Sequence, residues 1–514
     1  MAMSVSLMSC KKIKDGYVAD GELVVIQDVS DITLGVYGVD TLNPVATKSK
    51  SVQKIMNIVY EPLFTIDEEG KAVGVLASSY SVSDGGKKIT VTIKDGVKWH
   101  DGTNFTSEDV AYTLSRMRDA GGLYGKLSEK IHSFTATDKK TIVINFEKKE
   151  PSPVYLLTFP VVHRSDTYSE NADFTPEGTG SYKFVSRSGT EIVLEPNPQW
   201  HGGSISKRKI IVKILKDKNA VAEAFNVGEI DAITSDEISG GTVTTKSNSE
   251  SKTVVSERMV FLGFNTQSPV VSSPAVRKAI NGVLDRTKIV EQDAYGRGVP
   301  AELSIDPTSR FLPDESKGDK VENYSEDIMK KSGYIIKDGI YHKDDLPFSA
   351  RLLVNADNAE RTALADSIAT SLKTAGFDIV VEKTSYEEYG VKIAEDDFDI
   401  FIGETEVSKN PNPAALLTGE ENYFNFDAGK INSFMSKYCD VDDTDEIRKK
   451  IKEFKTLFYN DPPYLPIYFK TESVIYGSYV SGIVTPVVFD PYKEIEKWYF
   501  YDKDGKESKG RQDE

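Results

Sequence analysis

The sequence lacks the features that would place the chain in a membrane or on a nucleic acid. No run of about 18 apolar residues occurs, the length that a helix needs to cross a bilayer, so no transmembrane helix is predicted. Basic residues are in the minority, since 63 Lys and Arg stand against 80 Asp and Glu and give a formal net charge of −17. That charge repels the phosphates that supply most nucleic-acid affinity, so nucleic acid is not an expected partner.

Cysteine and histidine are scarce as well. The two cysteines, Cys10 and Cys439, are too few for a disulfide framework, and neither has the CxxC spacing of a zinc or redox site. The histidines share no HxxxH or HxH spacing that would hold a metal: His100, His132, His163, His201 and His342. The sequence therefore predicts neither a metal site nor a bound cofactor.

Motifs of enzymes are absent or incomplete. No GxSxG or Walker sequence occurs, and the stretch GTGSYK from Gly178 has Lys183 where a phosphate-binding GxGxxG needs its third glycine. The acidic stretch DVDDTDE at 440–446 lacks the glycine and the final glutamate of a calcium loop, so it is interpreted as the start of a helix near Asp445. Without a nucleophile, a base and an orienting group in one pattern, no catalytic residues are predicted.

The N-terminal sequence MAMSVSLMSCKK contains a pattern found in bacterial lipoproteins. Leu7-Met8-Ser9-Cys10 resembles a lipobox, whose cysteine is diacylated and becomes the first residue of the mature protein. The apolar stretch before it is short and lacks a basic start, so the sequence is expected to begin inside a signal peptide. We assign residues 1–17 to a signal remnant and linker with a lipid anchor at Cys10, and a chance cysteine is the alternative.

Length and composition indicate a globular protein with at least two lobes. The chain has 514 residues, of which 39% are hydrophobic and 28% charged. A single core stops growing at about 250 to 300 residues, so a chain of this length divides into smaller units.

The first half of the chain contains mainly predicted strands. Alternation of apolar and polar residues predicts them at 22–36, 88–95, 140–146, 181–196 and 209–216. Helical spacing of apolar residues predicts a short helix at 52–59.

A further helix is predicted to begin at Ser273-Pro274. The Ser273 hydroxyl is expected to cap it, and Pro274 suits the first turn. Val276, Ile280 and Val283 would form its buried stripe.

From residue 349 onward the pattern becomes regular. Strands are predicted at 349–354, 377–382 and 398–403, with helices at 359–375 and 386–394 between them. Strands that alternate with helices imply a parallel sheet covered on both faces, so this region is α/β.

The stretch VKWHDGTNFTSEDV, at 97–110, places Trp99, His100 and Asp101 before a predicted helix. Thr106 can cap that helix, and the acidic residues that follow it suit the positive end of the helix dipole. The stretch is interpreted as a strand, a tight turn and a capped helix. The alternative, a metal pair at His100 and Asp101, would need ligands that the sequence does not supply.

Taken in order, these segments resemble the family 5 extracellular solute-binding proteins, the oligopeptide and dipeptide receptors of bacterial ABC importers. The stretches that carry the resemblance span nearly the whole chain: TLNP (41–44), YEPLFTIDEEGKAVGVLASSYSVSDGGKKITVTIKDGVKWHDGTNFTSEDVAYTL (60–114), GTGSYKFVS with EPNPQWHGG (178–203), FLGFNTQSPVVSSPAVRKAINGVLDRTKIV (261–290) and DPPYLPIYF (461–469).

The resemblance implies a two-lobed periplasmic-binding-protein-like fold of type II, with two crossover strands near 261–265 and 468–475. The first lobe would be discontinuous, and an extra subdomain would belong to it, as in receptors for peptide-sized ligands. The implied segments are 18–57, 178–265 and 475–514 for the first lobe, 58–177 for its extra subdomain and 266–474 for the second lobe.

The resemblance also implies where a ligand binds. Peptide-binding relatives carry a G-W-x-x-D segment on the second lobe, whose aspartate pairs with the peptide ammonium. Here FDIFIGETEVSKNPNP occupies that place, so Gly403 matches the glycine, Glu404 replaces the tryptophan, and Val407 replaces the aspartate. Glu404 or Glu406 is therefore expected to act as the substitute anchor, with a surface glutamate as the alternative.

Other ligand contacts are expected on the first lobe and at the crossover. The backbone near Lys50, Ser51 and Val52 would face the segment from Gly403 to Thr405 across a cleft. Two exposed backbone edges would hold a peptide independently of its sequence. The remaining expected contacts, at the crossover, are Phe261 and Phe264.

Three functions follow as hypotheses. The first is an extracytoplasmic, lipid-anchored, monomeric receptor that delivers oligopeptides to the permease subunits of an ABC importer, without chemistry of its own. The second is a receptor of the same fold for another solute, such as a nickel chelate, haem or an oligosaccharide, because the aspartate anchor is missing. The third is a secreted hydrolase, for which the sequence offers no catalytic pattern.

Overall fold

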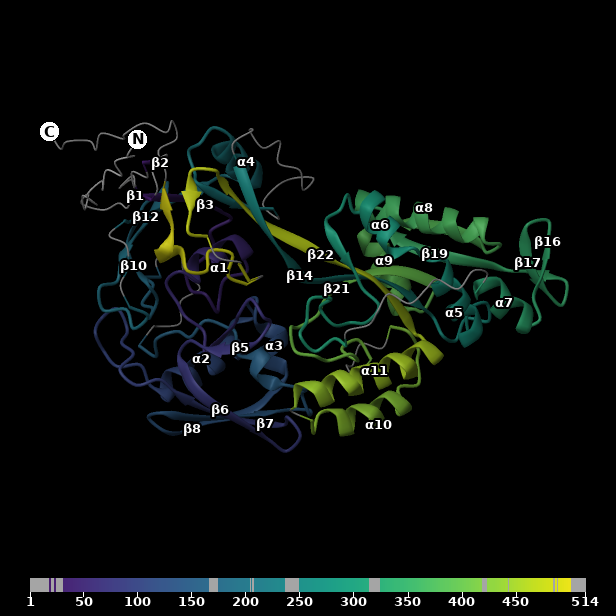
Figure 1. Cartoon of the computed structure of the whole chain (residues 1–514), viewed down its shortest axis with the longest axis horizontal. Coiled ribbons are helices and arrows are strands. Elements are labelled where there is room, and N and C mark those ends of the chain that lie inside the picture. Colours follow the sequence, from purple (N-terminus) through teal and green to yellow (C-terminus); the bar gives the residue numbers. More distant parts are fainter. Residues whose placement is uncertain are drawn as a thin grey trace, which may run out of the picture.

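The computed structural model describes residues 18–19, 23–24, 31–165, 174–203, 205, 208–235, 249–313, 324–417, 423–441, 443–483, 486–487 and 489–500. Cys10 and the predicted signal remnant at 1–17 lie outside these residues. Figure 1 shows two lobes joined by long strands, which confirms the predicted two-lobed α/β fold. None of the described helices has both the length and the apolar character of a membrane span.

The first lobe is built on a four-stranded sheet. The strands follow the order β10 (Tyr182–Arg187), β11 (Glu191–Pro196), β12 (Ile210–Leu215) and β3 (Ile32–Tyr37). β12 and β3 are parallel although more than 170 residues separate them in sequence. The helices of this lobe are α1 (Lys50–Met56) and α4 (Lys218–Asn226).

A second four-stranded sheet lies within residues 58–177, the predicted extra subdomain. Its order is β6 (Ala77–Ser83), β7 (Lys88–Ile93), β9 (Thr141–Phe146) and β8 (Ile131–Asp138), all antiparallel. Its other elements are the hairpin of β4 (Phe64–Ile66) and β5 (Ala72–Gly74), the helices α2 (Ser107–Ala120) and α3 (Gly125–Glu129), and the 3-10 turn Pro153–Leu156.

Helix α2 forms as the sequence predicts. Thr106 is its N-cap and makes a capping box with Asp109, while Val110, Leu114 and Met117 are buried. The preceding turn places Gly102 at φ +87°, and the Gly102 N–H donates to Trp99 O. The turn and the capped helix predicted for this stretch are therefore confirmed, whereas the strand before them already ends at Ile93, and Lys98 makes only an isolated bridge to Asn104.

Two long strands run from one lobe to the other (Figure 1). β14 (Ser249–Phe264) and β22 (Tyr464–Gly477) pair antiparallel along most of their length. They form the middle of a sheet with the order β13 (Ala232–Thr234), β22, β14, β21 (Ile400–Glu406), β19 (Ser349–Asn355) and β20 (Asp378–Thr384), and β15 (Gly298–Pro300) adds to β22. One sheet thus extends from the first lobe into the second.

The second lobe contains the predicted parallel segment. β19 is parallel to both β20 and β21. The helices between them are α8 (Ala359–Thr374) and α9 (Tyr386–Ala394). The Asn358 side chain caps α8, and Gly376 follows the helix at φ +96°, a conformation that suits glycine.

The other helices of the second lobe are α5 (Pro274–Val283), α6 (Arg286–Gln292), α7 (Tyr324–Lys331), α10 (Gly429–Tyr438) and α11 (Thr444–Asn460). The small strand groups of the molecule are β16 (Ile335–Lys337) with β17 (Ile340–Lys343) and β18 (Leu346–Pro347), β23 (Val480–Ser481) with β24 (Tyr499–Phe500), and β1 (Val18–Ala19) with β2 (Leu23–Val24). A 3-10 turn spans Ile495–Lys497.

The starts of helices α5 and α11 can be compared with their predictions. α5 begins after Ser273 as expected, but the Ser273 side chain makes no cap hydrogen bond, which corrects the prediction. α11 begins with the acidic stretch, and Asp443 accepts hydrogen bonds from the backbone of Asp445 and Glu446. The acidic stretch is therefore a helix start.

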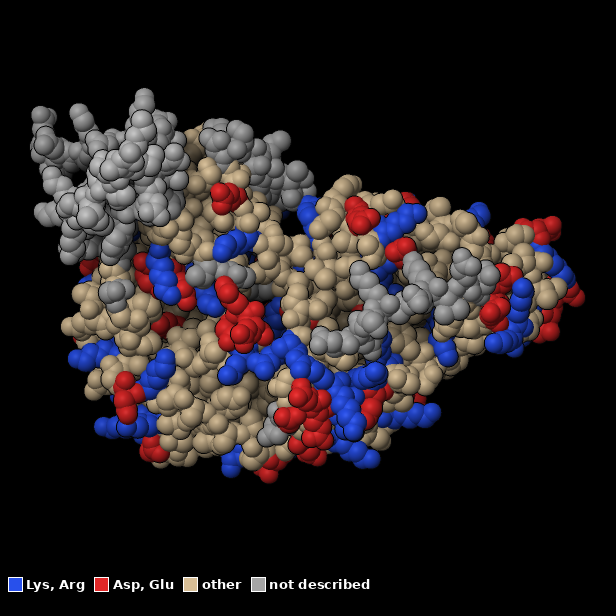
Figure 2. Space-filling view, in the orientation of Figure 1, with Lys and Arg blue, Asp and Glu red and all other residues tan. Residues whose placement is uncertain are grey.

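The lobes also touch outside the crossover strands. Lys149 in the predicted subdomain pairs with Asp440 at 2.6 Å, and Asn410 Nδ2 donates to Glu150 Oε2 at 3.2 Å. Figure 2 shows that acidic and basic side chains are interspersed on one face and that many gather near the middle, where the lobes meet. The structure thus has the lobes in contact with each other.

Candidate functional site

The predicted site residues come from three elements that meet between the lobes. Lys50, at the start of α1, reaches the second lobe, where its Nζ lies 2.6 Å from Oε1 of Glu406 at the end of β21. Both side chains are more than half exposed, so this ion pair contributes little stability. The ion pair does show that the first-lobe segment near Lys50 lies next to the end of β21.

One edge of β21 has no strand partner near its end. β14 pairs with β21 over all of Ile400–Glu406, whereas β19 pairs only with Ile400 and Phe401. Among the described strands, none covers the other edge of β21 from Ile402 to Glu406, although the Tyr389 hydroxyl donates to Ile402 O at 2.9 Å. An uncovered strand edge can accept the backbone of an extended chain.

Glu404 lies in a network of charges within the protein. Its carboxylate is 3.0 Å from Arg361 on α8 and 2.9 Å from Lys470 on β22, and its side chain is only 12% exposed. Burial pushes the pKa of Glu404 upward, but the charges of Lys470 and Arg361 outweigh it and hold the pKa below its ordinary value. A ligand ammonium would have to compete with two cations already in place, so the geometry does not favour Glu404 as the substitute anchor.

Gly403 makes room for an aromatic ring of the protein. A Cβ on Gly403 would lie 2.3 Å from the ring of Phe261, its cross-strand partner, and a Cβ on Gly263 would lie 2.2 Å from the ring of Phe401. Phe261 and Phe401 pack edge to face with ring centroids 5.6 Å apart. Gly403 is therefore explained by packing in the sheet, without a ligand.

The remaining expected contacts are largely internal. Phe264 is fully buried in the second-lobe core, and Val52 is buried in the first. Ser51 is 4% exposed, and its hydroxyl accepts from the Tyr37 N–H. In this arrangement the side chains that face the space between the lobes are those of Lys50 and Glu406, with Thr405 partly exposed.

Sequence reasoning missed Glu257, which lies on β14 beside this junction. Its backbone carbonyl accepts from the Val407 N–H at 2.7 Å, so it is fixed next to the end of β21. Burial raises the pKa of its carboxyl to about 7, although Lys409 acts in the opposite direction. The signal available in the sequence was a charged pair, Glu257-Arg258, just before the apolar second half of the strand.

His100 has a structural role. Its Nδ1 accepts from the Gly178 N–H, so Nε2 carries the proton and donates to Gly180 O at 3.1 Å. Burial lowers the pKa of His100 to about 4, which keeps the ring neutral. In the described part of the chain, no group of three or more His, Cys, Asp and Glu side chains could hold a metal ion.

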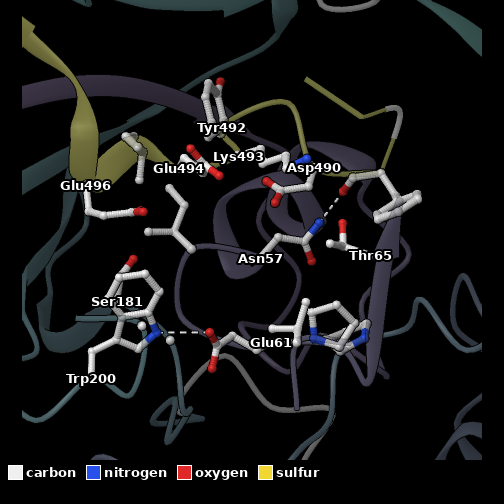
Figure 3. A pocket seen from close by; sticks show the side chains of 18 of the residues that line it. Asn57, Glu61, Thr65, Ser181, Trp200, Asp490, Tyr492, Lys493, Glu494 and Glu496 are labelled. Carbon is white, nitrogen blue, oxygen red and sulfur yellow. Dashed lines mark hydrogen bonds between the residues drawn. The ribbon is translucent and has the colours of Figure 1, made fainter. Parts of the chain in front are cut away.

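A separate pocket of about 330 Å³ lies within the first lobe (Figure 3). Glu61 on its wall accepts from Trp200 Nε1 at 2.9 Å, and burial raises the pKa of Asp490 on another wall to about 7. All lining residues belong to first-lobe elements and to the segment 489–497. None of the predicted site residues lines it, so this pocket is distinct from the junction of the lobes.

Comparison with known proteins identifies the family. Residues 71–422 match the family described as "Bacterial extracellular solute-binding proteins, family 5 Middle". The chain belongs to this family. Membership places it among extracellular solute-binding receptors, which are not a class of enzymes, and it confirms the resemblance noted in the sequence.

Relatives of known structure and sequence cover nearly the whole chain. The oligopeptide-binding protein AppA of Bacillus subtilis is 25% identical over 92% of this chain and 92% of its own. Its structure in complex with a nonapeptide matches with a TM-score of 0.62 at 22% identity, covering 92% of this chain and 99% of AppA. A nickel ABC transporter protein from Bacillus halodurans matches with a TM-score of 0.76 at 18% identity, covering 91% and 100%.

Proposed function

We propose that this family 5 protein is the receptor of an ABC importer that captures oligopeptides between its lobes and delivers them to the permease. The observation that carries the proposal is the edge of β21 from Gly403 to Glu406, which no described strand covers and which lies beside the first-lobe segment at Lys50. The peptide-binding name of AppA, which this chain matches along nearly its whole length, supports the same substrate class.

The mechanism is capture by backbone contacts followed by closure. A peptide that adds to the edge of β21 would use main-chain hydrogen bonds, which do not depend on its side chains. Closure would bring together Lys50 with Glu406 and Lys149 with Asp440, two of the pairs that join the lobes here. Because exposed ion pairs are worth at most about 1 kcal/mol each, these two would oppose opening only weakly. No catalytic step is needed.

A second candidate ligand comes from the name of one structural neighbour. The Bacillus halodurans structure, whose title names a nickel ABC transporter, has a higher TM-score than the AppA complex. Both likenesses are below 25% identity and so concern the fold. A nickel chelate is therefore the second ligand to test.

Peptide binding should stabilise and compact the protein. A pool of synthetic peptides of two to nine residues should raise the melting temperature, since a ligand at a hundred times its Kd stabilises by about 2.7 kcal/mol. X-ray scattering should show a smaller radius of gyration with peptide than without. A backbone N-methylated copy of a binding peptide should bind at least about tenfold more weakly, because it cannot donate to the β21 edge.

Two results would contradict the proposal of peptide capture at the β21 edge. If no peptide pool changes the melting temperature while nickel with histidine does, the protein is a receptor for a metal chelate. If a peptide binds and its N-methylated copy binds equally, capture at the strand edge is wrong.

The proposal includes a lipid anchor at Cys10 and a monomeric receptor. The lipobox-like sequence before Cys10 supports the anchor. Full-length protein made with its native signal peptide in a bacterial host should partition into the detergent phase, and Cys10→Ser should move it to the aqueous phase, because acyl chains supply the membrane affinity. Cys439→Ser is the matched control, since Cys439 is buried and should not affect partitioning. Equal partitioning of the Cys10→Ser protein and the parent would exclude the anchor.

A further inference from the structure

The pocket of the first lobe lies where three parts of that lobe meet (Figure 3). Its walls come from the predicted subdomain around Val75, from the sheet region around Trp200, and from the segment 489–497. Asn57, which follows α1, donates through Nδ2 to the Phe489 carbonyl on this wall. The pocket volume of about 330 Å³ falls within the range of ~300 to 1,000 Å³ that is usual for small-molecule sites. The pocket is therefore large enough for a compact ligand.

The charged side chains on the pocket walls are unevenly matched. Carboxylates outnumber ammonium groups by four to two, with Glu61, Asp490, Glu494 and Glu496 against Lys493 and Lys497. Both ammonium groups already have an acceptor. Lys497 pairs with Glu494, and Lys493 donates its Nζ to Ile66 O at 3.3 Å. The lining thus carries more negative charge than its own cations balance.

Two of the carboxylates accept hydrogen bonds from the protein. Glu61 accepts from Trp200 Nε1 and from His201 Nε2, the latter at 2.8 Å. Asp490 accepts from a backbone N–H of its own segment. Burial raises the pKa of the Asp490 carboxyl to about 7, although the charge of Lys493 acts in the opposite direction.

Glu496 is the buried carboxylate without a partner. It is 9% exposed and lines the pocket, and Figure 3 shows its side chain directed into the space that Glu61 and Asp490 also border. Its carboxylate makes no ion pair or hydrogen bond with any other described residue, and burial together with the charge of Glu494 raises its pKa. A desolvated carboxylate without a partner is costly, and a cationic ligand would relieve that cost.

We propose that this pocket binds a small aliphatic ammonium ion, with the carboxylates of Glu496 and Asp490 as its acceptors. The inference goes beyond the proposed function, because none of the residues expected to contact a peptide lines the pocket. A ligand held there would contact the sheet region, the predicted subdomain and the segment 489–497 at once. Its binding would therefore stabilise the first lobe as a unit.

The lining favours an ammonium with an alkyl chain over a metal ion. In the described part of the chain, no group of three or more His, Cys, Asp and Glu side chains could hold a metal. Ile58, Val75 and Ile495 provide apolar wall for an alkyl chain, and the Trp200 ring can contribute a cation–π contact. An ammonium donates three hydrogen bonds, which carboxylate oxygens accept as charge-assisted bonds.

The test titrates the purified full chain with butane-1,4-diamine and, for comparison, with butane-1,4-diol, which has the same length and no charge. Calorimetry in 1 M sodium chloride suppresses general attraction to an acidic surface, because the screening length falls to about 3 Å while buried pairs are screened much less. The diamine should bind at least about tenfold more tightly than the diol, as expected for hydrogen bonds to a charged group. It should also raise the melting temperature.

Glu496→Gln keeps the size of the side chain and removes its charge. This variant should bind the diamine at least about tenfold more weakly than the parent does. Glu191 provides the matched control, since it is an exposed glutamate of β11 in the same lobe and does not line the pocket. Glu191→Gln should bind the diamine as the parent does.

Three results would overturn the inference. If the parent protein binds the diamine no better than the diol, or binds neither, the pocket is not an ammonium site, whatever the stability of the variants. If Glu496→Gln binds the diamine as Glu191→Gln does, the ammonium binds elsewhere. If a peptide from the screen described above displaces the diamine, the diamine occupies the peptide site. The diamine titration itself needs no peptide, so a failure of the proposed function would leave its outcome unchanged.

Discussion

Replacing Arg277 by methionine should lower the free energy of unfolding by roughly 3 to 5 kcal/mol, the usual cost of breaking a buried charge network. The Arg277 side chain is 2% exposed in the second lobe. It donates to Pro462 O at 2.8 Å, Val271 O at 2.6 Å and Ser272 O at 2.7 Å, and it pairs with Asp461. Methionine fills similar space but leaves these acceptors without donors. Urea unfolding followed by circular dichroism measures the loss.

Asp461→Asn separates the role of the carbonyl contacts from that of the ion pair. The Asp461 side chain is 49% exposed, and asparagine keeps an acceptor oxygen for Arg277. The expected loss is below about 1 kcal/mol, as for exposed ion pairs. If the two variants lose equal stability, the charge pair carries the effect. A loss below about 1 kcal/mol for Arg277→Met would contradict the argument entirely.

The burial of Arg277 could not be predicted from the sequence. The stripe of Val276, Ile280 and Val283 on α5 was predicted from spacing; Val276 and Ile280 are buried, and Val283 is half-buried. The neighbouring arginine would ordinarily be assigned to the solvent face, because arginine is rarely buried without a partner. Its partners lie near residues 271 and 461. No local sequence pattern predicts the contact between Arg277 and Asp461, which are 184 residues apart.

The regular elements were predictable because local rules determine them. Alternation, helical spacing and the Thr106 cap are read from neighbouring residues, and the structure has β7, β9, α2 and the β19 to β21 segment at or near the predicted places. The crossover strands followed only from the resemblance to a family, since nothing local distinguishes them from other strands.

The candidate site was less predictable because its charged residues pair with residues that are far away in the sequence. Glu404 lies at the expected position, but its partner Arg361 is 43 residues away, and Lys470 lies on another strand. Gly403 was expected to admit a ligand backbone, whereas the ring of Phe261 occupies the space that its missing side chain leaves.

Gly178→Ala should destabilise the first lobe by roughly 3 kcal/mol or more, at or above the upper end of ordinary overpacking. A Cβ on Gly178 would lie 1.8 Å from the carbonyl oxygen of Val59, and the obstacle is backbone, which cannot rotate away as a side chain can. The same place holds the Gly180 N–H to Val59 O bond and the Gly178 bonds to His100. Moving Val59 would strain all of them, so thermal unfolding should show a large drop in melting temperature.

Gly390→Ala is the matched control with the opposite sign. Gly390 lies inside α9 on the second lobe, it is exposed, and a Cβ there meets nothing within 4 Å. Alanine should stabilise the helix by about 0.5 to 1 kcal/mol, since glycine loses more backbone freedom on folding. The two substitutions add the same methyl group, so opposite signs would assign the Gly178 effect to the contact with Val59. If Gly178→Ala also proves neutral or stabilising, the contact between Gly178 and the Val59 carbonyl must be longer in solution than in this structure. The hydrogen bonds between Gly178 and His100 would then be weaker as well.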